Sequence, residues 1–175
     1  MEILQFSFAL EEDLKVVGIN TSMVDYKLAW LMNQRLHFEF VRQGDIVRNG
    51  GHHAFFYYKP GENSNIYNLI SNYADGHVFL DKMKPRVDYF LIIKEDISEE
   101  QLQSIISKVR SISGVNYAFL LDLEMDKRMD QTLETIELHE NDQMKKLNDR
   151  RTLEYAKRQA AQNQEERKRQ SSPSL

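Results

Sequence analysis

Two stretches of the sequence are apolar on both faces, and a helical pattern separates them. Residues 87–93 show no alternation of polar and apolar side chains, and neither does the run from Ala118 to Leu121 at the centre of residues 115–123. Such runs are typical of strands that are covered on both sides. The residues between them have apolar side chains at helical spacing. Strand, helix and strand in this order predict a right-handed crossover between parallel strands.

The helix of this unit has recognisable ends. Ser98 is suited to the N-cap, and Glu99 and Glu100 place acidic side chains in the first turn, where the helix dipole favours them. Ser113-Gly114 supplies a C-terminal stop. We expect a helix over residues 98–110, whose buried face is made by Leu102, Ile105, Ile106 and Val109.

A second unit of the same kind is predicted closer to the N-terminus. It comprises a strand over 14–19, a helix over 22–36 and a strand over 38–43, with Asn20-Thr21-Ser22 offering N-cap side chains. Tyr26 and Trp30 are expected to seal the edge of the helix's apolar face. Residues 4–10 alternate with period two and predict a further strand, which could form a hairpin with 14–19.

A meander of strands is predicted between the two units. Asn49-Gly50-Gly51 is a strong turn signal, because positive φ costs little there. Residues 52–58 read as an aromatic strand, and its Phe and Tyr side chains are expected in the core rather than on a base-stacking surface. Strands at 66–70 and 78–80 complete the meander. The fold class is therefore α+β, a mixed but mostly antiparallel sheet with two helices on one face, as in ferredoxin-like folds.

The last third of the chain has a different character. Residues 126–169 contain neither glycine nor proline and predict a long helix, although 134–140 could also form a short strand. We expect a globular domain over 1–125, a charged helical extension over 126–170 and a disordered tail over 171–175. The extension has an apolar stripe, which is the predicted partner-binding surface: Met129, Leu133, Ile136, Met144 and Leu147.

Charge is distributed unevenly along the chain. The net charge is −4, but the nine basic and four acidic residues from Lys145 onward give that segment +5 and leave −9 on the rest. A basic segment on an acidic body can attract a neighbouring copy or an anionic polymer. The residues expected to steer such a contact form three basic clusters: Arg150 and Arg151, Lys157 and Arg158, and Arg167, Lys168 and Arg169.

Composition limits the chemistry. The chain has no cysteine, which excludes a disulfide framework, a thiolate zinc site and a cysteine nucleophile. No apolar run approaches the roughly 20 residues of a membrane span, and the first residues do not look like a secretory signal, so we expect a cytoplasmic protein without membrane contact. The seven glycines include no phosphate-binding spacing, and the histidines include no metal-binding pair. We predict no cofactor, no metal and no catalytic residue.

Two Asp-Tyr pairs are the remaining candidates for chemistry. Asp25-Tyr26 and Asp88-Tyr89 could support acid–base work if their carboxylates converged. The structural interpretation is preferred, because Asp25 suits the first turn of a helix and Asp88 stands at a strand entry, where aspartate accepts local backbone hydrogen bonds.

Residues from about 3 to 125 resemble the IPExxxVDY family of bacterial proteins. The matching segments are Gly18-Ile19, Asp25-Tyr26-Lys27-Leu28-Ala29-Trp30 with Asn33, Leu69-Ile70-Ser71-Asn72 and Val87-Asp88-Tyr89-Phe90-Leu91. The Ile-Pro-Glu half of the motif is missing, and Phe79-Leu80-Asp81 is its nearest equivalent. The resemblance implies a fold shared with small Bacteroidota proteins of unassigned function, and it implies structural roles for Asp25, Tyr26, Trp30, Val87, Asp88 and Tyr89.

These patterns favour a non-enzymatic domain that makes protein–protein contacts through its C-terminal helix, either with a second copy or with another protein. One alternative is a ferredoxin-like small-molecule sensor, which would need an apolar pocket with converging polar groups. A second alternative is a weak contact of the basic segment with anions or nucleic acid. Nucleic acid is the less favoured partner, because no aromatic side chains are interleaved with the basic residues.

Overall fold

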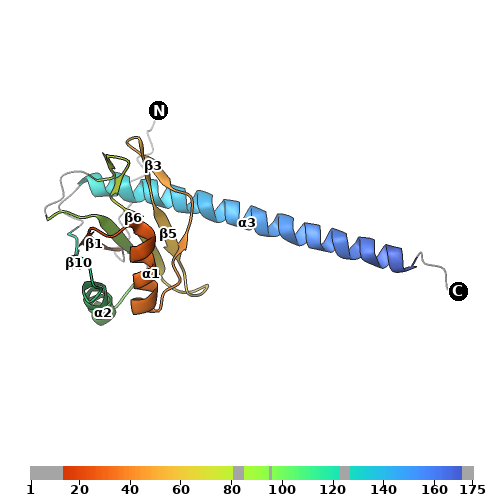
Figure 1. The fold of residues 1–175 in the computed structure, drawn as a ribbon, viewed down its shortest axis with the longest axis horizontal. Coiled ribbons are helices and arrows are strands. Elements are labelled where there is room, and N and C mark those ends of the chain that lie inside the picture. Colours follow the sequence, from red (N-terminus) through yellow and green to blue (C-terminus); the bar gives the residue numbers. More distant parts are fainter. Residues whose placement is uncertain (1–13, 81–84, 95, 123–126, 171–175) are drawn as a thin grey trace, which may run out of the picture. The chain divides into compact units, whose positions relative to one another are not determined.

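A computed structural model describes residues 14–80, 85–94, 96–122 and 127–170 (Figure 1), and for 127–131 and 165–170 it describes the backbone alone. The described residues form three helices: α1 (Asp25–Leu36), α2 (Glu99–Arg110) and α3 (Lys127–Gln170). Six strands form the main sheet: β1 (Lys15–Thr21), β2 (Val41–Arg42), β5 (Phe55–Tyr58), β6 (Ile66–Ser71), β9 (Tyr89–Lys94) and β10 (Val115–Leu120). Two small ribbons are made by β3 (Ile46–Arg48) with β4 (Gly51–His53), and by β7 (Tyr73–Ala74) with β8 (His77–Val78).

The strand order of the main sheet is β10-β1-β9-β6-β5-β2, and every recorded pair of neighbours is antiparallel. Because β1 is antiparallel to both β9 and β10, these two strands run in the same direction with β1 between them. The unit β9-α2-β10 is thus a split crossover, whose parallel strands are not neighbours. The α+β class with a mostly antiparallel sheet is confirmed.

This strand order also bears on the predicted N-terminal hairpin, because it shows which strands pair with β1. Both edges of β1 are occupied, one by β10 and the other by β9. A hairpin between residues 4–10 and β1 within this sheet is therefore wrong. Residues 4–10 themselves lie outside the described residues.

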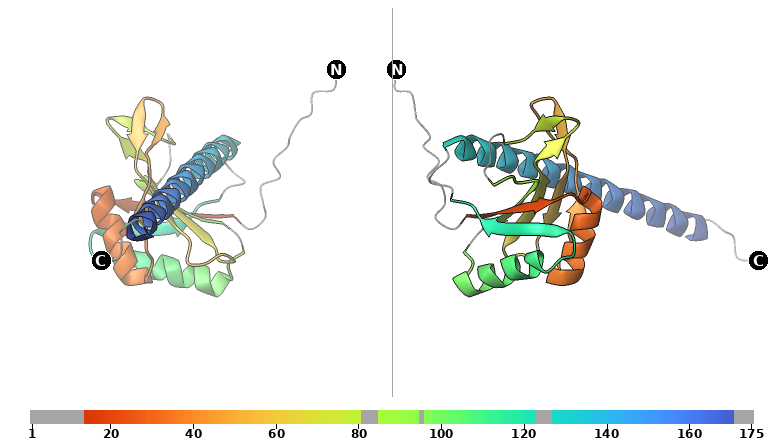
Figure 2. Two further views of the ribbon diagram at one scale, coloured as in Figure 1. Left: turned by 90° about the vertical axis from the view of Figure 1, so that its right-hand side faces the viewer. Right: turned by 60° about the vertical axis from the view of Figure 1, so that its left-hand side comes forward.

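Helices α1 and α2 pack on the same face of the sheet (Figure 2). Leu28, Met32 and Leu36 of α1 share one buried cluster with side chains of α2 and of the central strands. From α2 the cluster contains Leu102, Ile105, Ile106 and Val109, as the sequence predicted, and from the strands it contains Val17, Ile19, Leu69, Leu91 and Ile93. Alternate residues of β9, Phe90 and Ile92, point to the other face and are also buried, so the strand predicted within the apolar run 87–93 is covered on both sides, although it begins only at Tyr89.

Helix α1 begins three residues later than predicted. Thr21 is still the last residue of β1, and its hydroxyl donates to the Gly114 carbonyl at 2.6 Å while it accepts from Met23 N. The N-cap is Val24, which provides no side-chain hydrogen bond. The predicted Asn20-Thr21-Ser22 cap is therefore wrong, because the strand extends to Thr21 and the helix begins only at Asp25.

Tyr26 and Trp30 do not seal the apolar face of α1. Trp30 lies two residues from both Leu28 and Met32, which places it on the opposite side of the helix. Its side chain is 59% exposed, and that of Tyr26 is 69% exposed.

The aromatic segment is divided between two sheets. Residues 51–53 pair with β3 in a ribbon, and only Phe55–Tyr58 joins the main sheet. The predicted turn at Asn49-Gly50 is present, with both residues at positive φ. Phe55 and Phe56 are buried, as expected, while Tyr57 and Tyr58 are half-buried.

Strand β10 lies at an edge of the main sheet rather than in its centre. Its apolar composition predicted a strand covered on both faces, yet Leu120 is 41% exposed. Arg110 of α2 donates from Nε to the Ala118 carbonyl at 2.7 Å, and so satisfies one backbone oxygen of this strand. The prediction that this strand is covered on both faces is therefore wrong for Leu120.

The C-terminal part of the chain is one continuous α-helix. Residues 134–140 belong to α3, which settles the choice between helix and strand. The chain divides into two compact units, Met1–Glu134 and Thr135–Leu175, so the division falls inside α3. The tail at 171–175 lies outside the described residues.

Candidate functional site

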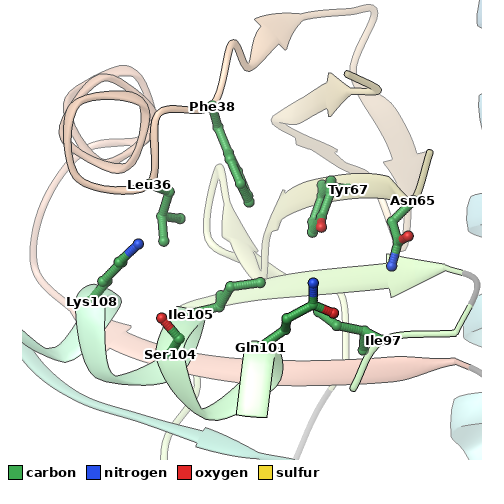
Figure 3. Close-up of a pocket in the computed structure, with 9 residues that line it drawn as sticks. All are labelled: Leu36, Phe38, Asn65, Tyr67, Ile97, Gln101, Ser104, Ile105 and Lys108. Carbon is green, nitrogen blue, oxygen red and sulfur yellow. The ribbon is translucent and has the colours of Figure 1, made fainter. Parts of the chain in front are cut away.

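A pocket of about 240 Å³ opens beside α2 (Figure 3). Its walls come from the end of α1, the segment that follows α1, the start of β6, and α2 with the residue before its cap. Five of the nine lining residues are apolar or aromatic: Leu36, Phe38, Tyr67, Ile97 and Ile105. The other four are polar: Asn65, Gln101, Ser104 and Lys108. An apolar pocket with a few polar groups is the general form of a small-molecule site.

The geometry of α2 explains the polar side of the pocket. Gln101, Ser104 and Lys108 are spaced by three and four residues, so they share one face of the helix. Ile105 stands on the same face and is buried at its base. One helical stripe therefore supplies both the apolar floor and the polar rim.

Aromatic rings form the opposite wall. The ring centroid of Phe38 lies 4.5 Å from that of Tyr67 and 4.9 Å from that of Tyr58, and the two tyrosine rings are stacked 5.8 Å apart. Burial raises the pKa of Tyr67, and the neighbouring Tyr58 adds to the effect. The Tyr67 hydroxyl consequently keeps its proton at neutral pH and can act as a hydrogen-bond donor.

The capping box of α2 sets the orientation of the Gln101 amide. Gln101 N donates to Ser98 Oγ at 3.2 Å, and Gln101 Oε1 accepts from Ser98 N at 3.3 Å. Because the amide oxygen is engaged at the helix start, the amide nitrogen is directed away from it. Figure 3 shows this nitrogen pointing toward the Tyr67 hydroxyl, across the pocket.

This pocket was not predicted from the sequence. For residues 98–110, only the ends and the buried face of the helix were predicted. The three- and four-residue spacing of Gln101, Ser104 and Lys108 was a visible signal, but nothing local indicates which strand residues face that stripe. The aromatic wall is contributed by Phe38 and Tyr67, which are far from α2 in sequence.

Asp88 of the Val-Asp-Tyr motif holds several segments together. Its carboxylate accepts from Asn20 Nδ2 at 2.7 Å and from Thr21 N at 3.1 Å, and it pairs with Arg86 Nε at 2.8 Å. Val87, the first residue of the motif, is buried. The carboxylate is thus fully engaged in contacts within the fold.

Tyr89 and the Asp25-Tyr26 pair are close to this network. The Tyr89 hydroxyl donates to the Met23 carbonyl at 2.7 Å. Burial raises the pKa of Tyr89 to about 12, and the charges of Asp25 and Asp88 contribute. Asp25 accepts from Tyr26 N and pairs with Arg42 at 2.6 Å. Each carboxylate therefore has its own basic partner, so the two are not arranged as an acid–base pair.

His53 is buried beside the ribbon formed by β3 and β4. Its Nδ1 lies 3.0 Å from the Ser71 carbonyl oxygen, and its ring packs edge-on against Phe79 at 5.0 Å. Burial lowers the pKa of His53, since no carboxylate compensates fully for the loss of water. Its neighbour His52 points outward and is exposed.

The predicted interface residues all lie on α3. Ile136 is buried, and Leu133, Met144 and Leu147 are half-buried, while the side chain of Met129 is outside the described residues. The stripe does not continue along the helix. At about 100° per residue, Leu153 lies roughly 120° around the axis from Leu147. Leu153 and Tyr155 are more than half exposed, and because they are two residues apart they lie on opposite sides of the helix.

The basic clusters of α3 are solvent-facing where they are described. Arg150, Arg151, Lys157 and Arg158 are exposed. The side chains of Arg167, Lys168 and Arg169 lie outside the described residues. Local contacts support the helix, including an ion pair between Lys146 and Asp142 at 2.6 Å.

Neither a group of metal ligands nor a membrane-spanning helix is present among the described residues. Within that part of the chain, no three histidine or acidic side chains are grouped so that they could hold a metal ion. Likewise, none of the helices described there has both the length and the apolar character needed to cross a bilayer.

Comparison of the chain with models of protein families, with curated proteins and with solved structures finds no match. The resemblance to the IPExxxVDY family accordingly stays a prediction from the sequence.

Proposed function

We propose that this protein is a non-enzymatic interaction or scaffold domain whose contact element is α3, and that its partner is a second copy of the chain. The proposal depends chiefly on one observation: every side chain from Asn148 to Gln164 is exposed. Helices in proteins are stabilised mainly by packing of an apolar face, and isolated helices are marginal. A helix exposed over this length is available for a partner surface.

The exposed half of α3 offers both kinds of contact that an interface needs. Leu153 and Tyr155 provide apolar area on opposite sides of the helix, and tyrosine is a frequent anchor of protein interfaces. The basic clusters at 150–151 and 157–158 precede and follow them along the helix. Apolar anchors with a charged periphery are typical of specific, water-exposed interfaces.

The charge distribution favours a second copy as the partner. The segment from Lys145 carries +5 and the rest of the chain carries −9, so the helix of one copy is attracted to the acidic part of another. Attraction of this kind is screened by salt. The cytoplasmic location expected from the sequence belongs to the same proposal.

Light scattering coupled to size exclusion tests this function on the full chain. We expect a dimer that dissociates as salt is raised. Leu153→Asp combined with Tyr155→Asp should shift the population to monomer. Gln162→Asp with Asn163→Asp is the matched control, because it adds the same charge at exposed positions of the same helix without removing apolar area. A full-length chain that stays monomeric at all protein concentrations would show that the proposal is wrong.

A further inference from the structure

The pocket beside α2 is lined by hydrogen-bond donors without a partner among the described residues, and three of the residues that carry them, Gln101, Ser104 and Lys108, are exposed. Within the described residues, no hydrogen bond is recorded for the Tyr67 hydroxyl, the Gln101 amide nitrogen or the Ser104 hydroxyl, and no ion pair is recorded for Lys108. Figure 3 shows these groups around a single cavity, with Lys108 at the end near Leu36 and Gln101 nearer to Tyr67. The unpaired groups can all donate, and lysine adds a positive charge.

The lining charges define the class of molecule that fits. Lys108 is the only charged residue among those that line the pocket, so a singly charged anion would be balanced there. A phosphate group would leave further negative charge without a partner. Ser104 is one helical turn from Lys108 and can donate to the same anion. This end of the pocket is therefore suited to a carboxylate.

The remainder of the pocket is suited to an apolar body. Phe38 and Tyr67 present rings on one side, and Ile97 and Ile105 present aliphatic side chains that are almost fully buried. The volume of about 240 Å³ is below that of most drug-sized sites, so the occupant is small. The Gln101 amide nitrogen can donate to an oxygen at the far end.

We propose that this pocket binds a small apolar molecule with one carboxylate, such as an aromatic or branched aliphatic acid. The carboxylate lies between Lys108 and Ser104, and the apolar body lies against Phe38, Tyr67 and Ile105. No residue of α3 lines this pocket, so the proposed binding can be tested separately from the proposed self-association.

Titration of the ¹⁵N-labelled full-length protein with phenylacetate and with 4-methylpentanoate tests the site. We expect saturable shifts of amide resonances in α2 and at the start of β6. The neutral amide of each acid should bind roughly fivefold more weakly, because it lacks the charge-assisted contact. Lys108→Gln should weaken binding of the acids by a similar factor and leave that of the amides unchanged. Lys27→Gln, at an exposed position of α1, is the control and should change neither.

A second variant separates binding from folding. Ser104→Trp fills the pocket from an exposed helix position, and it should abolish binding while the spectrum of the folded protein is retained. The proposal is overturned if the acids cause no saturable shifts, if acid and amide bind equally, if Lys108→Gln has no more effect than Lys27→Gln, or if inorganic phosphate binds as well as the acids.

Discussion

His53 is buried, and the hydrogen bonds that it makes in the fold do not fully replace those that it would make with water. Its Nδ1 donates to the Ser71 carbonyl, but its Nε2 has no hydrogen-bond partner among the described residues. Arg48 and Asp75 are the charged groups whose fields reach it, and they act in opposite directions. Gly51 is required beside the ring, because a Cβ there would lie 2.9 Å from His53 Nε2. Burial of the His53 imidazole thus disfavours a side chain at position 51 and also disfavours the protonated form of the ring.

This burial predicts a pH dependence of stability. Because the pKa of His53 is lowered in the folded state, the unfolded chain binds the proton more readily once the pH falls below about 6.5. The free energy of unfolding should decrease as the pH falls below about 6.5, by up to roughly 1.4 kcal/mol per pH unit. Urea denaturation at several pH values measures this.

The same strand provides the control for that measurement. His53→Gln removes the buried imidazole and should flatten the dependence in this window. His52→Gln removes an exposed imidazole from the adjacent position and should leave the slope as it is in the natural protein. Equal slopes for the two variants would show that His53 is not responsible.

At the scale of elements, α2 has a fully formed capping box. Ser98 Oγ accepts from Gln101 N, and the Gln101 side chain accepts from Ser98 N. Acidic residues in the first turn and Lys108 and Arg110 in the last turn complement the helix dipole. Helix α1 lacks a side-chain cap, so its start depends on the strand before it and on the packing of its apolar face.

We expect Ser98→Ala to destabilise the protein by about 1 kcal/mol, because the backbone N–H of Gln101 at the start of α2 loses its side-chain acceptor. Ser98→Gly should cost only a few tenths of a kcal/mol, since glycine is tolerated at an N-cap. Chemical denaturation of the three proteins compares them. If alanine and glycine have equal, negligible effects, the capping box does not contribute to stability.

At the scale of the whole molecule, the two compact units differ in how much apolar surface they bury. The unit Met1–Glu134 contains the sheet, α1 and α2, and buries the apolar cluster between them. The unit Thr135–Leu175 is helical where it is described and ends in a long exposed stretch. Side chains that are exposed contribute little to the free energy of folding of one copy, but they can contribute to association.

A chain that ends at Leu147 separates these effects. At the lowest protein concentration, its thermal midpoint should equal that of the full chain, because residues 148–164 are exposed. As concentration rises, the midpoint of the full chain should increase through self-association, and that of the shortened chain should not. Calorimetry over a range of concentrations gives both results. A shortened chain that is less stable at every concentration would mean that the removed residues support the fold itself.

The class of the fold and the positions of most elements follow from local patterns in the chain. Three local signals correspond to elements of the structure: the periodicity of residues 98–110, the apolar run at 87–93 and the turn at Asn49-Gly50. Each depends on the preferences of residues that are neighbours in the chain. The length of α3 followed from the absence of glycine and proline. Such features depend on residues close together in the chain, so they can be read without knowing the fold.

The way in which these elements are combined depends on contacts between distant parts of the chain. The position of β10 at an edge, the two neighbours of β1 and the exposure of Trp30 all depend on which distant faces meet. The pocket is the clearest case, since Phe38, Tyr67 and Lys108 come from separate segments and no local pattern links them. Strand order is set by the burial of the whole apolar surface at once, and that is a property of the folded chain.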